Sequence, residues 1–229
     1  MSQLRAINLM NSLEAVASGL YGIFVPIFLL TSGFDLQSVF IYLSISHLGI
    51  VPFFALAAKS CERFGLRKTM LWRFFFLFFY FISLLYLDKF NFLLYVSAVL
   101  GSLQASFFYY PQHFIFASHA GDHEMGKRVA LLYNWPQIVN ILMPLVSSLI
   151  AIIFGLKNLF IVSLFVYFFA SFYAYKTIDE IKIRVDFSWQ RFKNFLTLNR
   201  KHLKFLVIEN IRGDIQGVIW PVIFFYRNF

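Results

Sequence analysis

Long apolar stretches alternate with short polar connections along almost the whole chain. Seven stretches are long enough to cross a bilayer, which takes about 20 apolar residues each. They cover residues 4–30, 38–58, 69–87, 92–117, 129–154, 159–175 and 203–226. Backbone polar groups in lipid must pair within the protein, and the alternating ten-residue strands of a β-barrel are not seen in the pattern. The sequence therefore predicts an all-α membrane helix bundle with about seven transmembrane helices.

Composition supports this class. Hydrophobic residues make up 60% of the chain and charged residues only 14%, whereas soluble domains average about 25% charged. The net charge of +9 would suit a nucleic-acid partner, but the basic residues stand between the apolar stretches. We therefore expect a lipid bilayer around the chain and no nucleic-acid partner. Cys61 is the only cysteine, so no intrachain disulfide can form.

Basic residues divide unevenly between two sets of connections. Segments 31–37, 88–91 and 155–158 carry few, whereas segments 59–68, 119–128 and 176–204 are basic. With the N-terminus inside, sixteen fall on the inner side: Arg5, Lys59, Arg63, Arg67, Lys68, Arg73, Lys127, Arg128, Lys176, Lys182, Arg184, Arg191, Lys193, Arg200, Lys201 and Lys204. Lys89, Lys157 and Arg227 fall outside, and Arg212 lies within a span. The positive-inside rule therefore predicts a cytoplasmic N-terminus, and we expect the membrane to be the plasma membrane.

The long basic segment before the last span divides the chain into three predicted parts. Residues 1–176 would form a bundle of six spans, and residues 203–229 a seventh. Residues 177–202 would be a cytoplasmic linker. Part of that linker fits an amphipathic helix lying in the membrane interface, and a plain basic linker fits equally well.

A charged motif separates the second and third stretches. Residues 57–69 read AAKSCERFGLRKT. The motif resembles the loop after the second span of major facilitator superfamily transporters, which reads Gly, three residues, Asp-Arg-x-Gly-Arg-Lys. Glu62 stands at the Asp, Arg63 and Gly65 match, and Arg67 falls on the Lys. The sequence departs from that pattern at Ala58, at Glu62 and at Leu66. The alternative is a generic basic loop on the inner face.

The order of spans extends the resemblance. Six spans, a long basic connection and a seventh span match this family up to its midpoint, and residues 122–128 resemble a second loop of it. The resemblance implies a truncated twelve-span architecture with two six-span halves, each built of inverted three-span repeats. It implies a secondary active transporter that moves a small solute, with or without protons, by alternating access. A missing C-terminal half or a second copy would complete it. In this family the motif (Glu62, Arg63, Gly65, Arg67 and Lys68) would control conformational switching.

Polar residues inside the spans are the candidate solute or coupling-ion site, because each is costly in lipid. The candidates are Asn11, Glu14, Gln104, Asn134, Gln137, Glu209, Arg212 and Asp214. Helix packing explains the amides as well as a cavity lining does, so both interpretations stay open for Gln104, Asn134 and Gln137. The charged residues are the stronger candidates. Glu209 and Arg212 are spaced to pair along a helix, as a structural lock, a substrate site or a proton site.

Two other functions were weighed. A multi-span membrane enzyme would need a reactive cluster, and His119 and His123 alone do not make the several histidine boxes that hold two irons. A non-transporting membrane scaffold would tolerate the loss of Glu14 and Arg212, whereas a transporter would not. We therefore expect no enzyme activity, no catalytic residue, no metal site and no cofactor.

Overall fold

The computed structural model describes residues 3–119, 125–178, 180, 194 and 197–198. The chain divides into two compact units, Met1–Ile183 and Arg184–Phe229, and nearly all described residues belong to the first. The expected seventh span, with Glu209, Arg212 and Asp214, lies outside the described residues, as does most of the expected linker. The fold below is that of the first unit.

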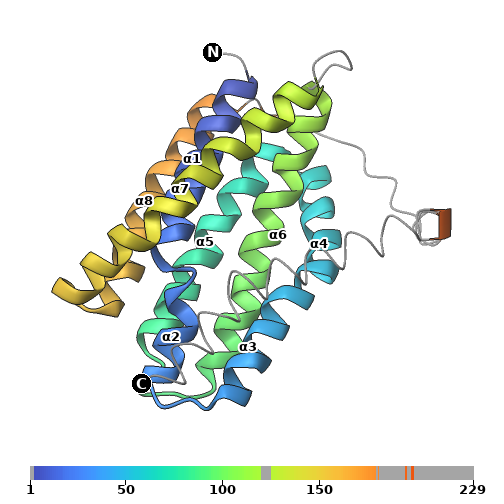
Figure 1. Ribbon diagram of the computed structural model, residues 1–229. Coiled ribbons are helices and arrows are strands. Elements are labelled where there is room, and N and C mark those ends of the chain that lie inside the picture. The colour runs from blue at the N-terminus through green and yellow to red at the C-terminus, as the bar shows by residue number, and fades with distance from the viewer. Residues whose placement is uncertain (1–2, 120–124, 179, 181–193, 195–196, 199–229) are drawn as a thin grey trace. The chain divides into compact units, whose positions relative to one another are not determined.

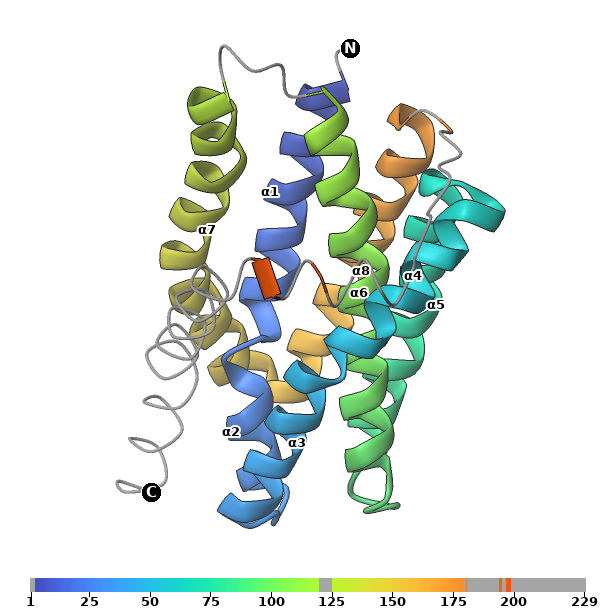
Figure 2. The same ribbon diagram turned by 90° about the vertical axis from the view of Figure 1, so that its right-hand side faces the viewer.

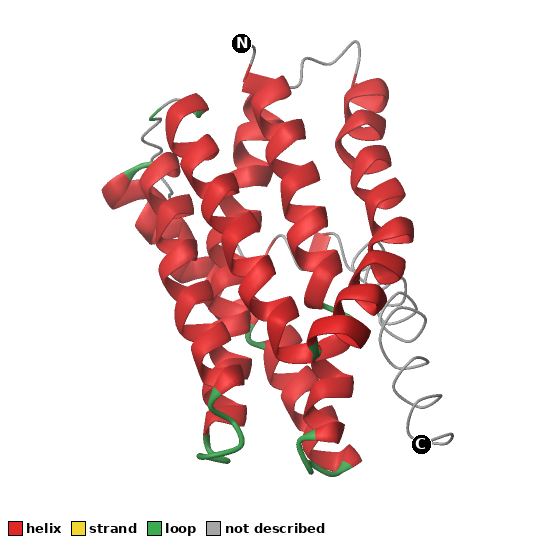
Figure 3. Cartoon of the chain, turned by 90° about the vertical axis from the view of Figure 1, so that its left-hand side faces the viewer, coloured by secondary structure: helices red, strands yellow, loops and turns green. Residues whose placement is uncertain are grey.

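Six apolar helical spans run through the first unit, and each is long enough to cross a membrane. They are Ala6–Thr31, Leu36–Phe64, Leu66–Leu85, Leu93–Phe116, Asn134–Phe154 and Leu156–Thr177. Eight helices build the spans over the described part of the chain: α1 (Gln3–Tyr21), α2 (Phe24–Thr31), α3 (Leu36–Leu48), α4 (Ile50–Phe64), α5 (Leu66–Leu85), α6 (Leu93–His119), α7 (Met125–Phe154) and α8 (Leu156–Thr177) (Figure 1). The described elements are all helices (Figure 3). The predicted all-α membrane bundle is confirmed.

The first two spans are each broken into two helices, where the sequence predicted one. In both, a glycine stands shortly before a proline: Gly22 before Pro26, and Gly49 before Pro52. Proline removes the hydrogen bond to the carbonyl four residues earlier, and glycine eases the change of direction. Pro111, Pro136 and Pro144 lie inside unbroken helices, and none of them has a glycine in that place. In the described helices, a span is therefore broken where a glycine precedes the proline and not where the proline stands alone.

Two serines of α6 donate hydrogen bonds to backbone carbonyls at the break in the second span. The hydroxyl of Ser102 lies 2.9 Å from the carbonyl oxygens of both Ile45 and Ser46, and the Ser106 hydroxyl lies 3.2 Å from that of Ile50. These carbonyls lie on both sides of the break, and that of Ile45 also accepts the backbone N–H of Gly49, so the serines fix α6 against the break. Gly49 is the contact point, because a Cβ there would lie 2.5 Å from the Ser102 hydroxyl.

The helices pack as a bundle in which α1 contacts α7 and α8, α5 contacts α6 and α8, and α6 also contacts α3 and α4 (Figure 2). Aromatic rings fill the centre. The ring of Phe81 lies 4.9 Å from that of Tyr21 and 5.9 Å from that of Phe160, measured between centroids. These contacts join α1, α5 and α8, which also carry Glu14, Arg73 and Tyr167.

One glycine makes the turn into α5 and another makes the turn into α8. Gly65 has φ 88° and ψ 166°, and Gly155 has φ 86° and ψ 159°. Each stands between Phe and Leu in the sequence. This backbone conformation is essentially restricted to glycine. The expected charged loop is thus shorter than predicted: Glu62 and Arg63 lie in the last turn of α4, and Arg67 and Lys68 in the first turn of α5.

Each glycine turn is followed by an ion pair that ties the third span to the sixth. Arg67 Nε lies 3.1 Å from the carboxylate of Glu180, just beyond α8. Lys157 pairs with Asp88, just beyond α5. The two pairs therefore stand at opposite ends of α5 and α8.

Candidate functional site

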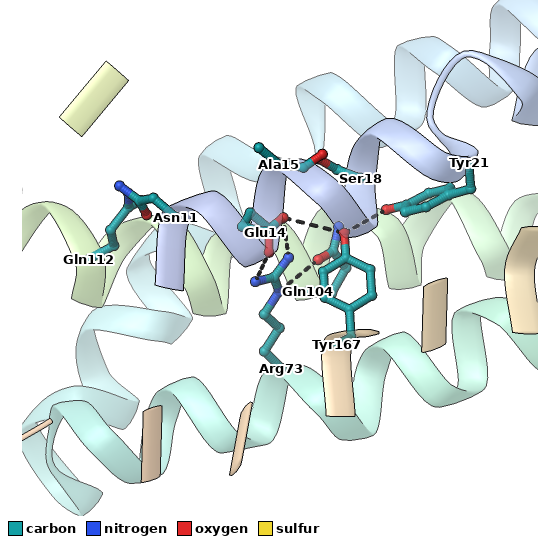
Figure 4. Close-up of polar contacts among 9 residues, drawn as sticks. All are labelled: Asn11, Glu14, Ala15, Ser18, Tyr21, Arg73, Gln104, Gln112 and Tyr167. Carbon is teal, nitrogen blue, oxygen red and sulfur yellow. Dashed lines mark hydrogen bonds and ion pairs between the residues drawn. The ribbon is translucent and has the colours of Figure 1, made fainter. Parts of the chain in front are cut away.

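A buried ion pair joins the first and third spans. Arg73 Nη2 of α5 donates to Glu14 Oε1 of α1 at 2.5 Å, and Nη1 pairs with Oε2 (Figure 4). The side chains are only 7% and 11% exposed. A hydrogen bond between charged groups is about twice as strong as one between neutral groups, and the second oxygen of Glu14 adds a charge contact without a hydrogen bond of its own. Because an unpaired charge in lipid is costly in free energy, each of the two side chains offsets the cost of burying the other.

The Arg73 guanidinium makes three further contacts. Its Nε donates to Gln104 Oε1 of α6 at 3.1 Å. Its central carbon lies 4.0 Å from the ring centroid of Phe108 and 4.8 Å from that of Tyr167. Aromatic faces attract such a cation, most strongly where water is excluded. Arg73 is therefore held by residues of three other spans.

Buried tyrosine hydroxyls continue the polar cluster beyond Glu14. Tyr167 donates to Glu14 Oε1 at 3.3 Å, and its hydroxyl oxygen lies 3.4 Å from that of Tyr21. The hydroxyls of Tyr80 and Tyr42 share a second hydrogen bond of 2.9 Å. The rings of Tyr21 and Tyr80 lie 6.0 Å apart, so the two tyrosine pairs are neighbours. Each of these side chains places its polar atom among polar partners within an apolar core.

A pair of amides lies on the other side of Glu14 along α1. Gln112 Nε2 of α6 donates to Asn11 Oδ1 at 2.5 Å (Figure 4). Both residues are 5% exposed. Gln112 Oε1 is buried and has no hydrogen-bond partner among the described residues. A buried acceptor without a partner costs free energy, so this atom is suited to accept a hydrogen bond from a ligand or a water.

A small cavity of about 20 Å³ adjoins the ion pair. Its lining residues are Met10, Glu14, Met70, Arg73, Phe108, Tyr167, Ala170, Ser171 and Ala174. That volume accommodates about one water molecule, and Glu14, Arg73 and Tyr167 supply polar partners for it. The cavity lies on the side of the pair where α5 and α8 meet.

The structure brings part of the predicted site together. Glu14 and Gln104 meet through Arg73, and Asn11 lies one turn from Glu14. Asn134 and Gln137 are exposed on α7 and are not among the contacts of this cluster. Glu209, Arg212 and Asp214 lie in the part of the chain that is not described.

Arg73 was missed by the sequence analysis, which counted it among the basic residues of the inner side. The structure places Arg73 within the third span, Leu66–Leu85, about 10 Å along α5, rather than in the preceding loop. Arg73 is 6% exposed and is held by Glu14. The sequence held one sign of this, since residues 70–72 before it and 74–79 after it are all apolar. An ionisable residue that interrupts an apolar stretch is a candidate functional residue.

The residues of the charged motif differ in their contacts. Arg67 pairs with Glu180 at the end of α8, while Glu62, Arg63 and Lys68 are exposed. In the described residues, no three His, Cys, Asp or Glu side chains gather in the manner of a metal site. His123, one of the two weighed as metal ligands, lies outside the description.

The family model of the Major Facilitator Superfamily matches residues 7–226. The chain belongs to the Major Facilitator Superfamily. Members of this superfamily are transporters rather than enzymes, so the protein is a multi-pass membrane transporter in the general sense. The resemblance drawn from the charged motif and the order of spans is confirmed. No curated protein and no solved structure shows a significant match to the chain.

Proposed function

We propose that this superfamily member is a secondary active transporter that moves a small solute by alternating access, with protons as the coupling ion. The observation that carries the proposal is the Glu14–Arg73 pair, buried where two further spans contribute Gln104 and Phe108 of α6 and Tyr167 of α8. Ionisable residues inside the membrane are rare and mark solute or proton pathways.

Protonation of Glu14 would couple the proton to the solute. A protonated carboxyl no longer balances Arg73, and an uncompensated cation in this position costs several kcal/mol. An anionic group of a solute would restore the balance. Proton binding and anion binding would therefore favour the same conformation, which is the requirement for coupling. This argument favours a solute with a carboxylate, phosphate or similar group.

Alternating access requires a second bundle facing the first. In our proposal that bundle is the C-terminal half of a twelve-span protein or, alternatively, a second copy of this chain. Asn134 and Gln137, exposed on α7, and the undescribed Glu209, Arg212 and Asp214 would then contribute to the solute pathway between the bundles. Conformational switching would involve the Glu62, Arg63, Gly65, Arg67 and Lys68 motif. The N-terminus would be cytoplasmic and the membrane the plasma membrane.

The test uses membrane vesicles from cells that produce the protein, with an imposed pH gradient. A panel of radiolabelled small carboxylates and phosphate esters is screened for uptake. For the solute that is taken up, Glu14→Gln is expected to abolish accumulation driven by the gradient while exchange of solute across the membrane continues. Gradient-driven accumulation that survives in Glu14→Gln would refute the coupling role. Asp88→Asn, which removes an exposed acid outside the proposed pathway and the charged motif, is the matched control and should still accumulate solute against its gradient.

A further inference from the structure

A groove of about 280 Å³ opens on the side of the bundle between α4, α5 and α6, away from the Glu14–Arg73 pair. Its lining residues are Leu56, Lys59, Ser60, Arg63, Phe64, Trp72, Phe76 and Phe107. Leu56 is 48% exposed and Trp72 45% exposed. The groove therefore faces the surroundings of the bundle and not its polar centre.

The polarity of the groove changes along the helices. Lys59, Ser60 and Arg63 lie in the last turns of α4, close to the Gly65 turn. Phe76 lies on α5 about 15 Å from the start of that helix, so it belongs to the hydrocarbon region. Trp72 lies between these two levels, where aromatic residues commonly sit in membrane proteins. One end of the groove is thus cationic and near the membrane surface, and the other is apolar and deep.

The two cations of the groove are available to a ligand. Lys59 and Arg63 stand one turn apart on the same face of α4, and neither forms an ion pair with a described residue. In contrast, Arg67, Arg73 and Lys157 each pair with a carboxylate. The only acid in the motif, Glu62, is not among the lining residues. The polar end therefore carries two positive charges without an acidic partner in the described chain.

We propose that this groove binds an anionic phospholipid. The phosphate and the anionic headgroup would contact Lys59 and Arg63, and one acyl chain would lie along Trp72, Phe76 and Phe107. An anionic lipid matches the groove in both respects, because its charge is at the membrane surface and its chain points inward. A zwitterionic lipid carries its own cation and leaves the charge of the groove uncompensated. The site is separate from the solute and proton pathway proposed above.

Trp72 offers a direct test. The full chain is prepared with Trp135→Phe, Trp189→Phe and Trp220→Phe, so that Trp72 is the only fluorescent tryptophan, and is reconstituted in vesicles. Quenching is measured with brominated phosphatidylglycerol and with brominated phosphatidylcholine, each diluted into unbrominated lipid. We expect phosphatidylglycerol to be preferred at Trp72 by about fivefold for each basic residue, the ratio that about 1 kcal/mol per residue gives.

Substitutions at Lys59 and Arg63 test whether the lipid preference depends on their positive charge, independently of any effect on folding. Lys59→Gln with Arg63→Gln is expected to reduce the preference to about one, whereas Lys59→Arg with Arg63→Lys keeps it. Lys89→Gln, at the other end of α5, is the matched control and should change nothing. The proposal is overturned if both lipids quench Trp72 equally in the unaltered groove. It is equally overturned if the double Gln variant keeps the preference, or if neither lipid quenches Trp72 because protein covers the groove. Circular dichroism of each variant establishes that the helices are retained.

Discussion

Gly65 and Gly155 adopt the same backbone conformation at opposite ends of the bundle, and each is followed two residues later by a basic residue in an ion pair. The surroundings of the two glycines differ. A Cβ on Gly65 would lie 1.8 Å from Glu180 Oε1, whereas nothing lies within 4 Å of a Cβ on Gly155. The Glu180 carboxylate therefore leaves no room for a side chain at Gly65, whereas the space beside Gly155 is empty.

This difference gives a matched pair of substitutions. Gly65→Ala and Gly155→Ala both force an L-residue into a conformation that costs roughly 1–3 kcal/mol. Gly65→Ala should cost more, because it also displaces Glu180 from Arg67, a contact worth at most about 1 kcal/mol at this exposure. Thermal unfolding in detergent measures both. The difference in stability loss between Gly65→Ala and Gly155→Ala should shrink when Glu180→Ala is already present. If that difference is unchanged, displacement of Glu180 does not cause it.

The Glu14–Arg73 pair should stabilise the fold only as a pair. Glu14→Gln is expected to lower the free energy of unfolding by about 3–5 kcal/mol, because it leaves Arg73 buried and uncompensated. Glu14→Gln combined with Arg73→Met should recover much of this loss. Asp88→Asn, which breaks the exposed pair with Lys157, is the control and should cost less than about 1 kcal/mol. Strictly additive effects of the two substitutions at Glu14 and Arg73 would contradict the pairing.

The Tyr167 hydroxyl can be tested without disturbing its ring. Tyr167→Phe keeps the aromatic face beside Arg73 but removes the hydrogen bond to Glu14, which should cost about 1–3 kcal/mol of stability. Thermal unfolding in detergent measures this cost. In a Glu14→Gln background the cost of Tyr167→Phe should shrink, because the carboxylate that accepts the bond is gone. An unchanged cost there would show that the hydroxyl does not act through Glu14.

Topology can be mapped with a membrane-impermeant thiol reagent in a Cys61→Ser background. We expect Gln37→Cys and Lys89→Cys to react from outside the cell, and Lys68→Cys and Lys176→Cys to react only after permeabilisation. These four positions are exposed in the structure, so burial does not mask the result. Labelling of Lys68→Cys in intact cells would reverse the predicted orientation.

The charged motif should affect the rate of switching more than solute binding. Glu62→Ala is expected to slow uptake at saturating solute several-fold while the solute concentration at half-maximal uptake stays within about twofold. Contacts that exist in only one access state shift the balance between states without touching the solute. Arg63→Gln removes the neighbouring charge and should act in the same direction. A large loss of apparent affinity at normal maximal rate would argue for a solute contact instead.

The span pattern was predictable because lipid leaves the backbone few alternatives. Apolar length alone located all six of the described spans, and the charged motif indicated the family. The breaks at Gly22 and Gly49 were readable in principle from glycine followed by proline. They were missed because a proline by itself, as at Pro111, leaves a helix unbroken.

The site was predictable only in part. Glu14 and Gln104 were named because polar residues are rare within apolar stretches. Their meeting through Arg73 depends on the packing of three spans, which no local pattern contains. Arg73 stands near the start of its apolar run, and charge counting alone cannot separate such a residue from one at the membrane surface. The partners of Arg67 and Lys157 were equally hidden, because each lies far away in the sequence.

The positions of the ion pairs in the sequence set the order in which they can form during synthesis. Glu14 and Arg73 are 59 residues apart in the sequence, so a chain emerging N-terminus first can join them once its third span is in the membrane. Arg67 and Glu180 are 113 residues apart, and Lys157 also waits for a late span before it meets Asp88. The charges most costly to expose to lipid are thus neutralised early in synthesis. The Arg67–Glu180 and Lys157–Asp88 pairs form only when the sixth span is in place. Until then, water can solvate these exposed charges.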